Sequence, residues 1–523
     1  MFTNKKSLLA LSIASAFALT GCFSDDDSNE YTPPGPGPEP EVVVPPEQPA
    51  ALGAVVYGNV VDLEDAAALP STISFFEAGV ASENIVDVDG NVTATVDSED
   101  GSFVFQIKDG VDLSQVTAVI TAENYVSKAF VVDLSELSAG DVSVELGLTS
   151  TDAEGLAIAT PVEATISEDG TSATDIEVPV DNGDGASSKI VIPANTVLQD
   201  ANGAPVTGTV TVKVTTAKPG SAAAAAIVPQ GLNSADSTTV LTPSGVTSVE
   251  MVNADGVKIK KFSSPINVDM AVKEGSAATL DLSSQNEDTG VWTAEDQDVT
   301  VVGEVGSFTT DHLTFFAATT SSPVCATPVR FLFSGDTFPS PTGLNLRISS
   351  SDIDATLPGV KGNLTVPTPW VSFFGISDTA ETRVRVRDIE GNVWFDSVSE
   401  VAICGDVNVA LTAPDVVFQS ETLNVTAVCS NDTDVSVGAS GALVKYSRAN
   451  KASKVAKGDG TGNYALNNMV EGETYNVTVK YKGSLSSIAD AAFTVTADGT
   501  DEVRTESIEC AVSTGGTGGT GGN

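Results

Sequence analysis

The chain has 523 residues, of which 70 are acidic and 25 basic, and its formal net charge is −45. Such an excess of carboxylates repels phosphate backbones, which excludes nucleic acid as an expected partner. The one histidine, His312, leaves the rest of the chain without the most common general base and metal ligand, so we expect no enzyme that turns over a substrate. The length predicts about three to four globular domains.

The N-terminal segment has the order of an export signal. Two lysines precede an apolar run from Leu8 to Leu19, which is too short for a stable membrane span, and Thr20-Gly21-Cys22 follows. This end of the run resembles the bacterial lipobox. The resemblance implies that residues 1–21 are removed and that acyl chains such as palmitate are attached to Cys22. In that family an aspartate after the lipidated cysteine retains the protein in the inner membrane. Phe23 therefore implies the outer membrane, with the periplasmic face and the cell surface both open.

Residues 22–52 are acidic and then rich in proline, for example over residues 33–38. Proline-rich segments without hydrogen-bonding partners extend at about 3.1 Å per residue. We therefore predict a disordered tether that holds the first folded domain away from the membrane.

Beyond the tether, apolar and polar residues alternate with period two, as in Ser102-Phe103-Val104-Phe105-Gln106. Glycine, Asp-Gly or Asn-Gly interrupts these segments every 8 to 12 positions or so, which is typical of short strands joined by tight turns. The pattern predicts an all-β protein of tandem β-sandwich domains. The expected boundaries are 53–150, 151–320, 321–411 and 412–512, with a disordered Gly/Thr-rich tail at 513–523.

Two of these domains carry a family pattern. Residues 53–150 contain Gly58-Asn59-Val60-Val61-Asp62, then an Asp-Gly hairpin over residues 97–105, then Asn124-Tyr125. This order resembles the carboxypeptidase regulatory-like, or transthyretin-like, domain, and the resemblance implies a non-catalytic sandwich used for contact and scaffolding. A similar order over residues 458–479 indicates a degenerate repeat in the fourth domain. The third domain has no evident family.

The second domain, residues 151–320, has a partial resemblance to the β-sandwich of ankyrins, netrin receptors and autoproteolytic adhesion receptors. The resemblance rests on residues 190–195 and on the end at His312-Leu313-Thr314. In those receptors such a tripeptide is a cleavage site. A histidine two positions before a hydroxyl can accept its proton, so that Thr314 Oγ1 attacks the Leu313 carbonyl. Self-cleavage between Leu313 and Thr314 is therefore one hypothesis, and an ordinary strand histidine is the other. The alanine run at residues 222–226 lacks caps and is interpreted as a loop.

Four cysteines remain after Cys22, at positions 325, 404, 429 and 510. Their even number in an exported protein, without a C-x-x-C spacing, predicts two structural disulfides. Three connectivities are open, and we favour Cys325 with Cys404 and Cys429 with Cys510, because each pair then lies within one domain.

Two acidic turns raise the alternative of a calcium site. Asp87, Asp89 and Asn91 in one turn, and Asp181 and Asp184 in another, are candidate calcium ligands, although neither turn is a complete calcium loop and solvated turn carboxylates are the favoured interpretation.

Two tryptophans raise the alternative of a sugar-binding surface. Trp370 and Trp394 are candidates for stacking on sugar rings, although such residues more often belong to a core.

Together these features predict a lipid-anchored outer-membrane protein that presents a row of sandwich domains as a non-enzymatic structural or adhesive module. Its expected partners are the membrane, through the lipid, and a protein or polysaccharide of the envelope or matrix. No cofactor is expected besides the lipid at Cys22 and calcium. The alternatives are an autoproteolytic surface protein and a carbohydrate-binding accessory protein.

Overall fold

The computed structural model describes residues 41–233, 238–339 and 343–513, so the predicted signal peptide, Cys22 and most of the tail lie outside the described residues. Within them the chain is almost entirely β-strand, with two short α-helices, and it forms four sandwich-like domains. The all-β prediction is confirmed. Strands such as β8 (Gln115–Thr121) and β37 (Thr474–Lys480) alternate buried and exposed side chains residue by residue, as period-two sequences do when one face packs on a core.

The first domain consists of two packed sheets, ordered β10-β2-β7-β5 and β4-β3-β8-β9, with β6 beside β3. Its remaining strands are β2 (Val56–Asp62), β3 (Ser71–Glu77), β4 (Val80–Ala81), β5 (Ile85–Val86), β6 (Thr95–Ser98), β7 (Ser102–Ile107), β9 (Lys128–Asp133) and β10 (Val142–Leu148). The core contains Phe75, Phe103 and Phe105. Only glycine fits at position 58, because a Cβ there would lie 2.2 Å from the Phe103 ring.

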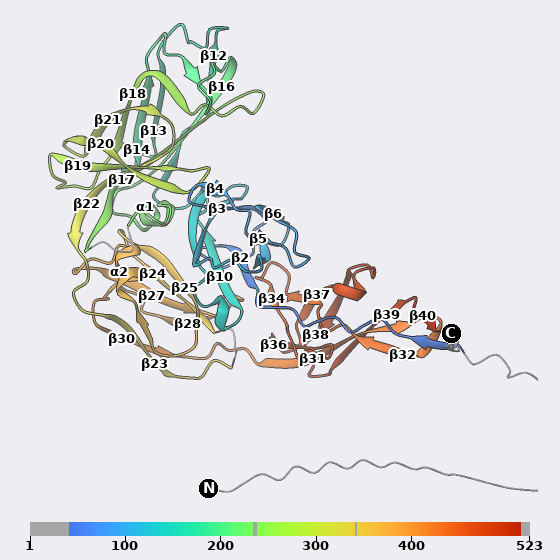
Figure 1. The fold of residues 1–523 in the computed structure, drawn as a ribbon. Coiled ribbons are helices and arrows are strands. Elements are labelled where there is room, and N and C mark those ends of the chain that lie inside the picture. Colours follow the sequence, from blue (N-terminus) through green and yellow to red (C-terminus); the bar gives the residue numbers. More distant parts are fainter. Residues whose placement is uncertain (1–40, 234–237, 340–342, 514–523) are drawn as a thin grey trace, which may run out of the picture.

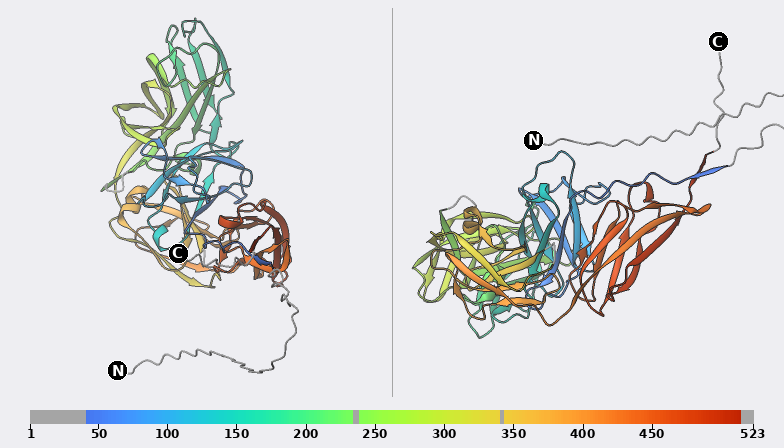
Figure 2. Two further views of the ribbon diagram at one scale, coloured as in Figure 1. Left: turned by 45° about the vertical axis from the view of Figure 1, so that its right-hand side comes forward. Right: turned by 90° about the horizontal axis from the view of Figure 1, so that it is seen from below.

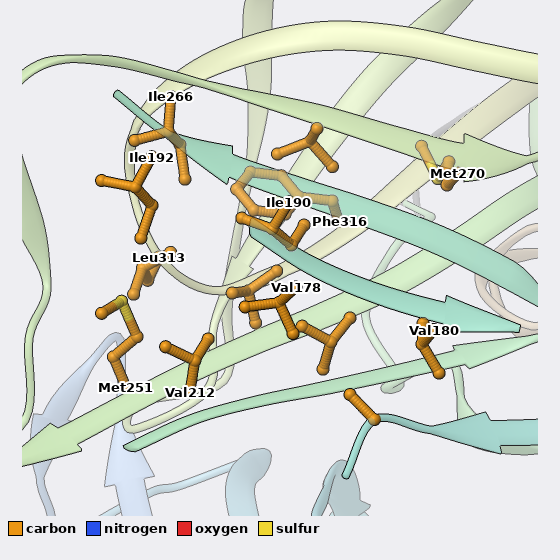
Figure 3. Close-up of a cluster of buried hydrophobic side chains, with 14 of the residues drawn as sticks. Val178, Val180, Ile190, Ile192, Val212, Met251, Ile266, Met270, Leu313 and Phe316 are labelled. Carbon is orange, nitrogen blue, oxygen red and sulfur yellow. The ribbon is translucent and has the colours of Figure 1, made fainter. Parts of the chain in front are cut away.

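The second domain is built on one twelve-stranded sheet, whose main path is β11-β16-β17-β22-β19-β20-β21-β18-β14-β13. The sheet encloses a core of aliphatic residues with Phe308 and Phe316, part of which Figure 3 shows. The strands are β11 (Leu156–Ile158), β12 (Val162–Ile166), β13 (Ile176–Asp181), β14 (Ser187–Ile192), β15 (Leu198–Gln199), β16 (Gly208–Ala217), β17 (Thr239–Asn253), β18 (Lys261–Ala271), β19 (Thr279–Asn286), β20 (Val291–Val302), β21 (Val305–His312) and β22 (Phe315–Pro323).

One local prediction in this domain was wrong. The alanine run forms helix α1 (Ala222–Ile227) instead of a loop. Ser221 supplies the N-terminal cap, because its hydroxyl accepts a hydrogen bond from the Ala224 amide at 3.2 Å. Burial of four of its alanines and Ile227 against neighbouring strands stabilises a helix that would be marginal alone.

The third domain has sheets ordered β26-β23-β30 and β25-β24-β27-β28, and helix α2 (Thr368–Phe373) packs beside them. Its strands are β23 (Val329–Gly335), β24 (Leu344–Ser349), β25 (Asp354–Val360), β26 (Leu364–Val366), β27 (Glu381–Arg387), β28 (Val393–Asp396), β29 (Val401–Ala402) and β30 (Asp406–Leu411). The fourth domain has sheets ordered β32-β31-β36-β35, with β39 beside β31, and β34-β33-β37-β38. Its strands are β31 (Phe418–Cys429), β32 (Asp432–Gly438), β33 (Leu443–Ser447), β34 (Lys454–Val455), β35 (Lys457–Gly458), β36 (Asn463–Val470), β38 (Ala491–Thr496) and β39 (Glu502–Ile508).

Three of the four domains share one strand topology. In each, the first strand pairs in parallel with the last, as β2 with β10, β23 with β30 and β31 with β39. The first strand also pairs antiparallel with β7, β26 or β36, and the second sheet has the central pair β3-β8, β24-β27 or β33-β37. The third domain, for which the sequence suggested no family, thus has the connectivity of the first and fourth.

The domains do not form a simple row. Figure 1 shows the first domain, in blue and cyan, between the green second domain, the yellow-orange third and the red fourth, and it contacts all three. Figure 2 shows the N-terminal described segment, in dark blue, running along the fourth domain before it enters the first. The prediction of a row of sandwich modules is therefore corrected to an assembly around a central domain.

Candidate functional site

Buried hydrogen bonds connect the domains, beside apolar contacts such as that of Val126 with the cluster around α1. At the junction of the first and fourth domains, the Asn59 side chain donates to the Ser453 carbonyl at 2.9 Å and accepts from the Ser453 amide at 2.8 Å. Both residues are buried, and the neighbouring Ala67 and Lys451 form a β-bridge. The Asn59 side-chain amide thus bonds both backbone groups of Ser453, as a neighbouring strand would, and fixes the relative position of the two domains.

The junction of the first and third domains is lined by arginines. Arg347 donates to the Leu63 carbonyl at 3.0 Å, and Arg387 donates to the Glu64 carbonyl at 2.6 Å. Glu145 hydrogen-bonds Asn345 beside them, and its burial raises the pKa of the Glu145 carboxyl. The cavity between these side chains measures about 10 Å³, which is room for about one water molecule.

The first and second domains meet at a buried lysine. Lys128 Nζ donates to the carbonyl of Ala226, in α1, at 2.6 Å, and its burial lowers the pKa of Lys128 to about 8. Next to it, Gln230 and β9 exchange two hydrogen bonds of 2.9 and 3.0 Å through Ala129 and Val131. The second domain is therefore hydrogen-bonded to the edge strand of the first.

The third and fourth domains are joined through one buried carboxylate. Glu390 is 2% exposed and accepts hydrogen bonds from Arg448 at 2.6 Å and from the Tyr475 hydroxyl at 2.8 Å. Lys454, which is 5% exposed, forms an ion pair with the same carboxylate, and its ammonium group lies over the rings of Tyr446 and Tyr475. Two cations thus surround one anion between the domains.

A tight turn directs Glu390 into the fourth domain. Asp388 Oδ1 accepts the backbone amides of Glu390 and Asn392, each at 3.0 Å, which closes the turn between β27 and β28. Gly391 has a φ of +86°, and a Cβ there would lie 2.8 Å from Cβ of Ala66 in the first domain. This turn therefore contacts the first and fourth domains together.

The ionisation of Glu390 predicts acid sensitivity at this junction. Burial opposes the charge of Glu390, but Lys454 and Arg448 outweigh burial and hold the pKa of its carboxyl below its ordinary value. A carboxyl with a lowered folded-state pKa stabilises the fold above its unfolded pKa, and this contribution is lost as the pH falls through the folded value. We expect the contact between domains three and four to loosen in that acidic range, measured as lower protection factors for the amides of residues 388–392 than at pH 7, with each exchange rate divided by the intrinsic rate at its own pH. Unchanged protection there would contradict the prediction.

Part of the predicted tether is folded against the fourth domain. Strand β1 (Val42–Val44) pairs antiparallel with β40 (Ala511–Ser513). Farther along, Gln48 donates to the Gly460 carbonyl at 2.9 Å, and the buried Pro49 accepts a hydrogen bond from Ser440. The prediction that residues 22–52 are a disordered linker is therefore wrong for residues 42–49, because their backbone groups find partners that the local sequence does not reveal. The predicted tail at 513–523 is likewise paired at Ser513.

The cysteines are joined as the sequence favoured. Disulfides connect Cys325 with Cys404 and Cys429 with Cys510, across 79 and 81 residues. The first lies within the third domain. The second connects the end of β31 to the residue just before β40.

The His-Leu-Thr tripeptide lies at the end of β21, but its groups are not arranged for cleavage. His312 Nδ1 lies 3.2 Å from Thr310 Oγ1 and 3.1 Å from Asp311 Oδ1, and Nε2 faces Glu295 at 3.4 Å. Thr314 Oγ1 is buried without a hydrogen-bond partner, and Leu313 belongs to the core. The histidine therefore does not hydrogen-bond the hydroxyl whose proton it would accept.

We expect the purified protein to run as a single full-length band in denaturing electrophoresis, because Thr314 has no paired base. The Thr314→Ala variant is the matched control and should give the same pattern. Fragments of the wild type ending at Leu313 that are absent from the variant would contradict this prediction.

The candidate calcium ligands are engaged within the protein. Asp87 Oδ1 accepts the amides of Asp89 and Asn91 at 2.8 and 2.9 Å, and Asp89 forms ion pairs with Lys480 and Lys482 of the fourth domain. In the second domain, Asp181 accepts the Gly183 amide at 2.7 Å and Asp184 pairs with Lys218 at 3.3 Å. Among the described residues there is no group of three or more potential metal-ligating side chains.

Calcium is accordingly expected to leave the melting temperature of the chelator-treated protein unchanged, because the nearby lysines already neutralise Asp89. Magnesium at the same ionic strength is the control, since either cation screens a chain this acidic. A rise in melting temperature with calcium alone would contradict the prediction.

The two tryptophans that are candidates for stacking on sugars differ in their exposure to solvent. Trp394 is 2% exposed, and its indole packs edge-on against Phe338 and donates to Asp388 Oδ2 at 3.3 Å. It is a core residue, so its assignment as a ligand residue is wrong; its alternation in β28 places it on the inner face. Trp370 is half-buried on α2 and packs against Phe373 and Phe374.

A groove of about 270 Å³ lies at one end of the third domain, lined partly by Phe333, Phe338, Leu344 and Leu411. Phe338 and Gly343 flank residues outside the described part of the chain, so we assign this groove no ligand. None of the helices in the described ranges is long and apolar enough to cross a membrane.

Glu390, Arg448 and Lys454 were not anticipated from the sequence. Glu390 lies in the turn between β27 and β28, where a glutamate is ordinarily solvated, and nothing in the local pattern marks it as buried. To predict this buried ion pair from the sequence, one would have to know which residues of the third and fourth domains are in contact.

Comparisons with known proteins leave the family open. The sequence matches no protein-family model and no curated protein. Among solved structures, the Bacillus anthracis TIE protein aligns at 10% identity and a TM-score of 0.14, over 69% of this chain and 59% of its own length. The full-length RrgB pilus protein of Streptococcus pneumoniae and the full-length major pilin SpaD of Corynebacterium diphtheriae each align at 10% identity and a TM-score of 0.14. They cover 87% and 88% of this chain and 98% and 97% of their own. TM-scores this low carry no inference about activity or partners.

Proposed function

We propose that this protein is an outer-membrane lipoprotein, anchored through Cys22, that acts as a non-enzymatic structural or adhesive element of the cell envelope. The lipobox-like N-terminus supports the anchor, and the scarcity of catalytic side chains supports a role in binding. A single bound acyl chain holds a protein only marginally, whereas two or more hold it stably.

The observation that carries the proposal is the set of buried polar contacts around the first domain. Asn59, Arg347 and Lys128 each hydrogen-bond a different neighbouring domain. Because unpairing such buried groups is unfavourable, the four domains are expected to move as one body. A rigid body on a tether is suited to holding a partner at a set distance from the membrane.

The path of the tether orients this body. Residues 42–49 lie against the fourth domain, so the fourth domain is nearest the anchor, and the second domain, at the opposite side of the assembly in Figure 1, is farthest from it. The second domain is therefore the part that we expect to meet a protein or polysaccharide partner. With a chain charge of −45, that partner is expected to be neutral or cationic.

Protease treatment of intact cells tests the location and the orientation. If the protein faces the medium, protease should digest it on intact wild-type cells. If it faces the periplasm, protease should digest it only after the outer membrane is opened. In both cases we expect the second domain to be cleaved before the fourth. The Cys22→Ser variant should be released in soluble form. The Phe23→Asp variant is the matched control, which should stay membrane-bound but fractionate with the inner membrane. A Cys22→Ser protein that remains membrane-bound, or a deletion strain with normal attachment and envelope integrity, would overturn the proposal.

A further inference from the structure

Strand β40 and strand β1 form a two-stranded ribbon that joins the two ends of the described chain. Val42 lies opposite Ser513, and Val44 lies opposite Ala511. The two chain ends therefore leave the ribbon on the same side, while the ends that continue into the folded domains, at Val44 and Ala511, lie together on the other side. We call this ribbon the terminal clasp.

We propose that the terminal clasp carries tension from the N-terminal tether directly into the fourth domain. A pull on the N-terminal tether acts on β1 at Val42, along the axis of the strand. Strand β40 is held by the fourth domain at Ala511, which lies at the opposite end of the ribbon. Because antiparallel hydrogen bonds lie perpendicular to the strands, this pull loads the bonds of the ribbon together in shear instead of opening them one after another.

The fourth domain holds β40 against such a pull by a covalent bond. Cys510, directly before β40, is bonded to Cys429 at the end of β31, and the Cys510 carbonyl accepts a hydrogen bond from Asn431 at 2.9 Å. Strand β31 is the central strand of its sheet and pairs with β32, β36 and β39. Tension in β40 therefore passes into the middle of a sheet.

Contacts behind the clasp reinforce it. Ser484 donates to the Glu47 carbonyl, and a Cβ at Gly441 would lie 2.5 Å from the Ala50 carbonyl oxygen, so the chain runs tightly along the fourth domain. It first hydrogen-bonds the first domain at Ala54 and Val55, directly before β2 begins at Val56. For as long as the clasp holds, tension therefore bypasses the segment between β1 and β2 and reaches the other domains through the junctions of the fourth domain.

Single-molecule force spectroscopy on the full chain tests this proposal without a membrane, so its outcome is independent of the proposed anchoring. The chain is pulled between its N-terminus and a peptide tag inserted at Gly303, in the exposed turn between β20 and β21. Release of residues 42–53 should appear as the first rupture, with a gain in length of at most about 45 Å, since a chain extends by about 3.6 Å per residue.

Two truncations form a matched pair. Ending the chain after Cys510 removes β40 but keeps both disulfides, and we expect the first rupture to disappear or to shift to a markedly lower force. Ending it after Ser513 keeps the clasp and should leave the rupture force unchanged. Hydrogen exchange of residues 42–44 provides a second readout, with faster exchange expected only in the shorter chain. Equal rupture forces in the two truncations, or equal exchange, would overturn the proposal.

Discussion

Replacing Glu390 by alanine is expected to destabilise the joined third and fourth domains by about 3–5 kcal/mol, because it leaves Lys454 and Arg448 as buried cations without their shared anion. The loss is larger than for a surface ion pair because the carboxylate is only 2% exposed and water cannot replace it. Urea unfolding followed by tryptophan fluorescence reports the change, since Trp394 hydrogen-bonds Asp388 in the same turn.

The chain offers a matched control for this substitution. Glu473 also faces Arg448, at 3.8 Å, but its side chain is 53% exposed. Glu473→Ala should therefore shift stability by less than about 1 kcal/mol, as exposed ion pairs do. The double variant Glu390→Gln/Lys454→Met removes one charge of each sign and should recover part of the loss. If Glu390→Ala and Glu473→Ala lowered the free energy of unfolding by equally small amounts, the buried network would not be joining the domains.

Removal of either disulfide is expected to destabilise its own domain by about 4.5 kcal/mol, because each closes a loop of about 80 residues and so restricts the unfolded chain. The variants are Cys325→Ala/Cys404→Ala for the third domain and Cys429→Ala/Cys510→Ala for the fourth. Each pair is changed together so that no free thiol remains.

The two disulfide variants serve as controls for each other. In a Trp292→Phe background, tryptophan fluorescence follows the third domain, which contains the other two tryptophans, Trp370 and Trp394. Hydrogen exchange follows the fourth, whose aromatic core includes Tyr464 and Tyr475. Each variant should lower the unfolding midpoint of its own domain most strongly. An equal fall of the unfolding midpoint in all domains, or no fall in either domain, would show that loop closure does not govern stability here.

The fold class could be predicted because it depends on local patterns. Alternation such as that of residues 102–106 appears in the structure as β7, and the Asp-Gly signal before it appears as a turn with Gly101 at positive φ. The disulfide pairing also followed from local reasoning, because Cys325 and Cys404 are separated by about one sandwich domain.

The parts that the sequence did not reveal are those that join distant segments. The environment of Glu390 is made by residues of another domain, and Val42–Val44 looks like the rest of a proline-rich linker until its partner at Ala511–Ser513 is known. Trp394 illustrates the same limit in the opposite direction. An aromatic residue in a strand faces either core or solvent, and only the packed domain decides which.

The central place of the first domain has a consequence for how the molecule matures. Asn59 is translated early, yet its partner Ser453 follows 394 residues later. At about 5–20 residues per second, a ribosome needs roughly 20–80 s to make that stretch. For this interval the nascent first domain has a bare flank where the last domain will dock, and in an exported chain transport adds to the delay. Any chaperone that accompanies this protein should therefore bind the surface around Asn59 and be displaced when the fourth domain docks there.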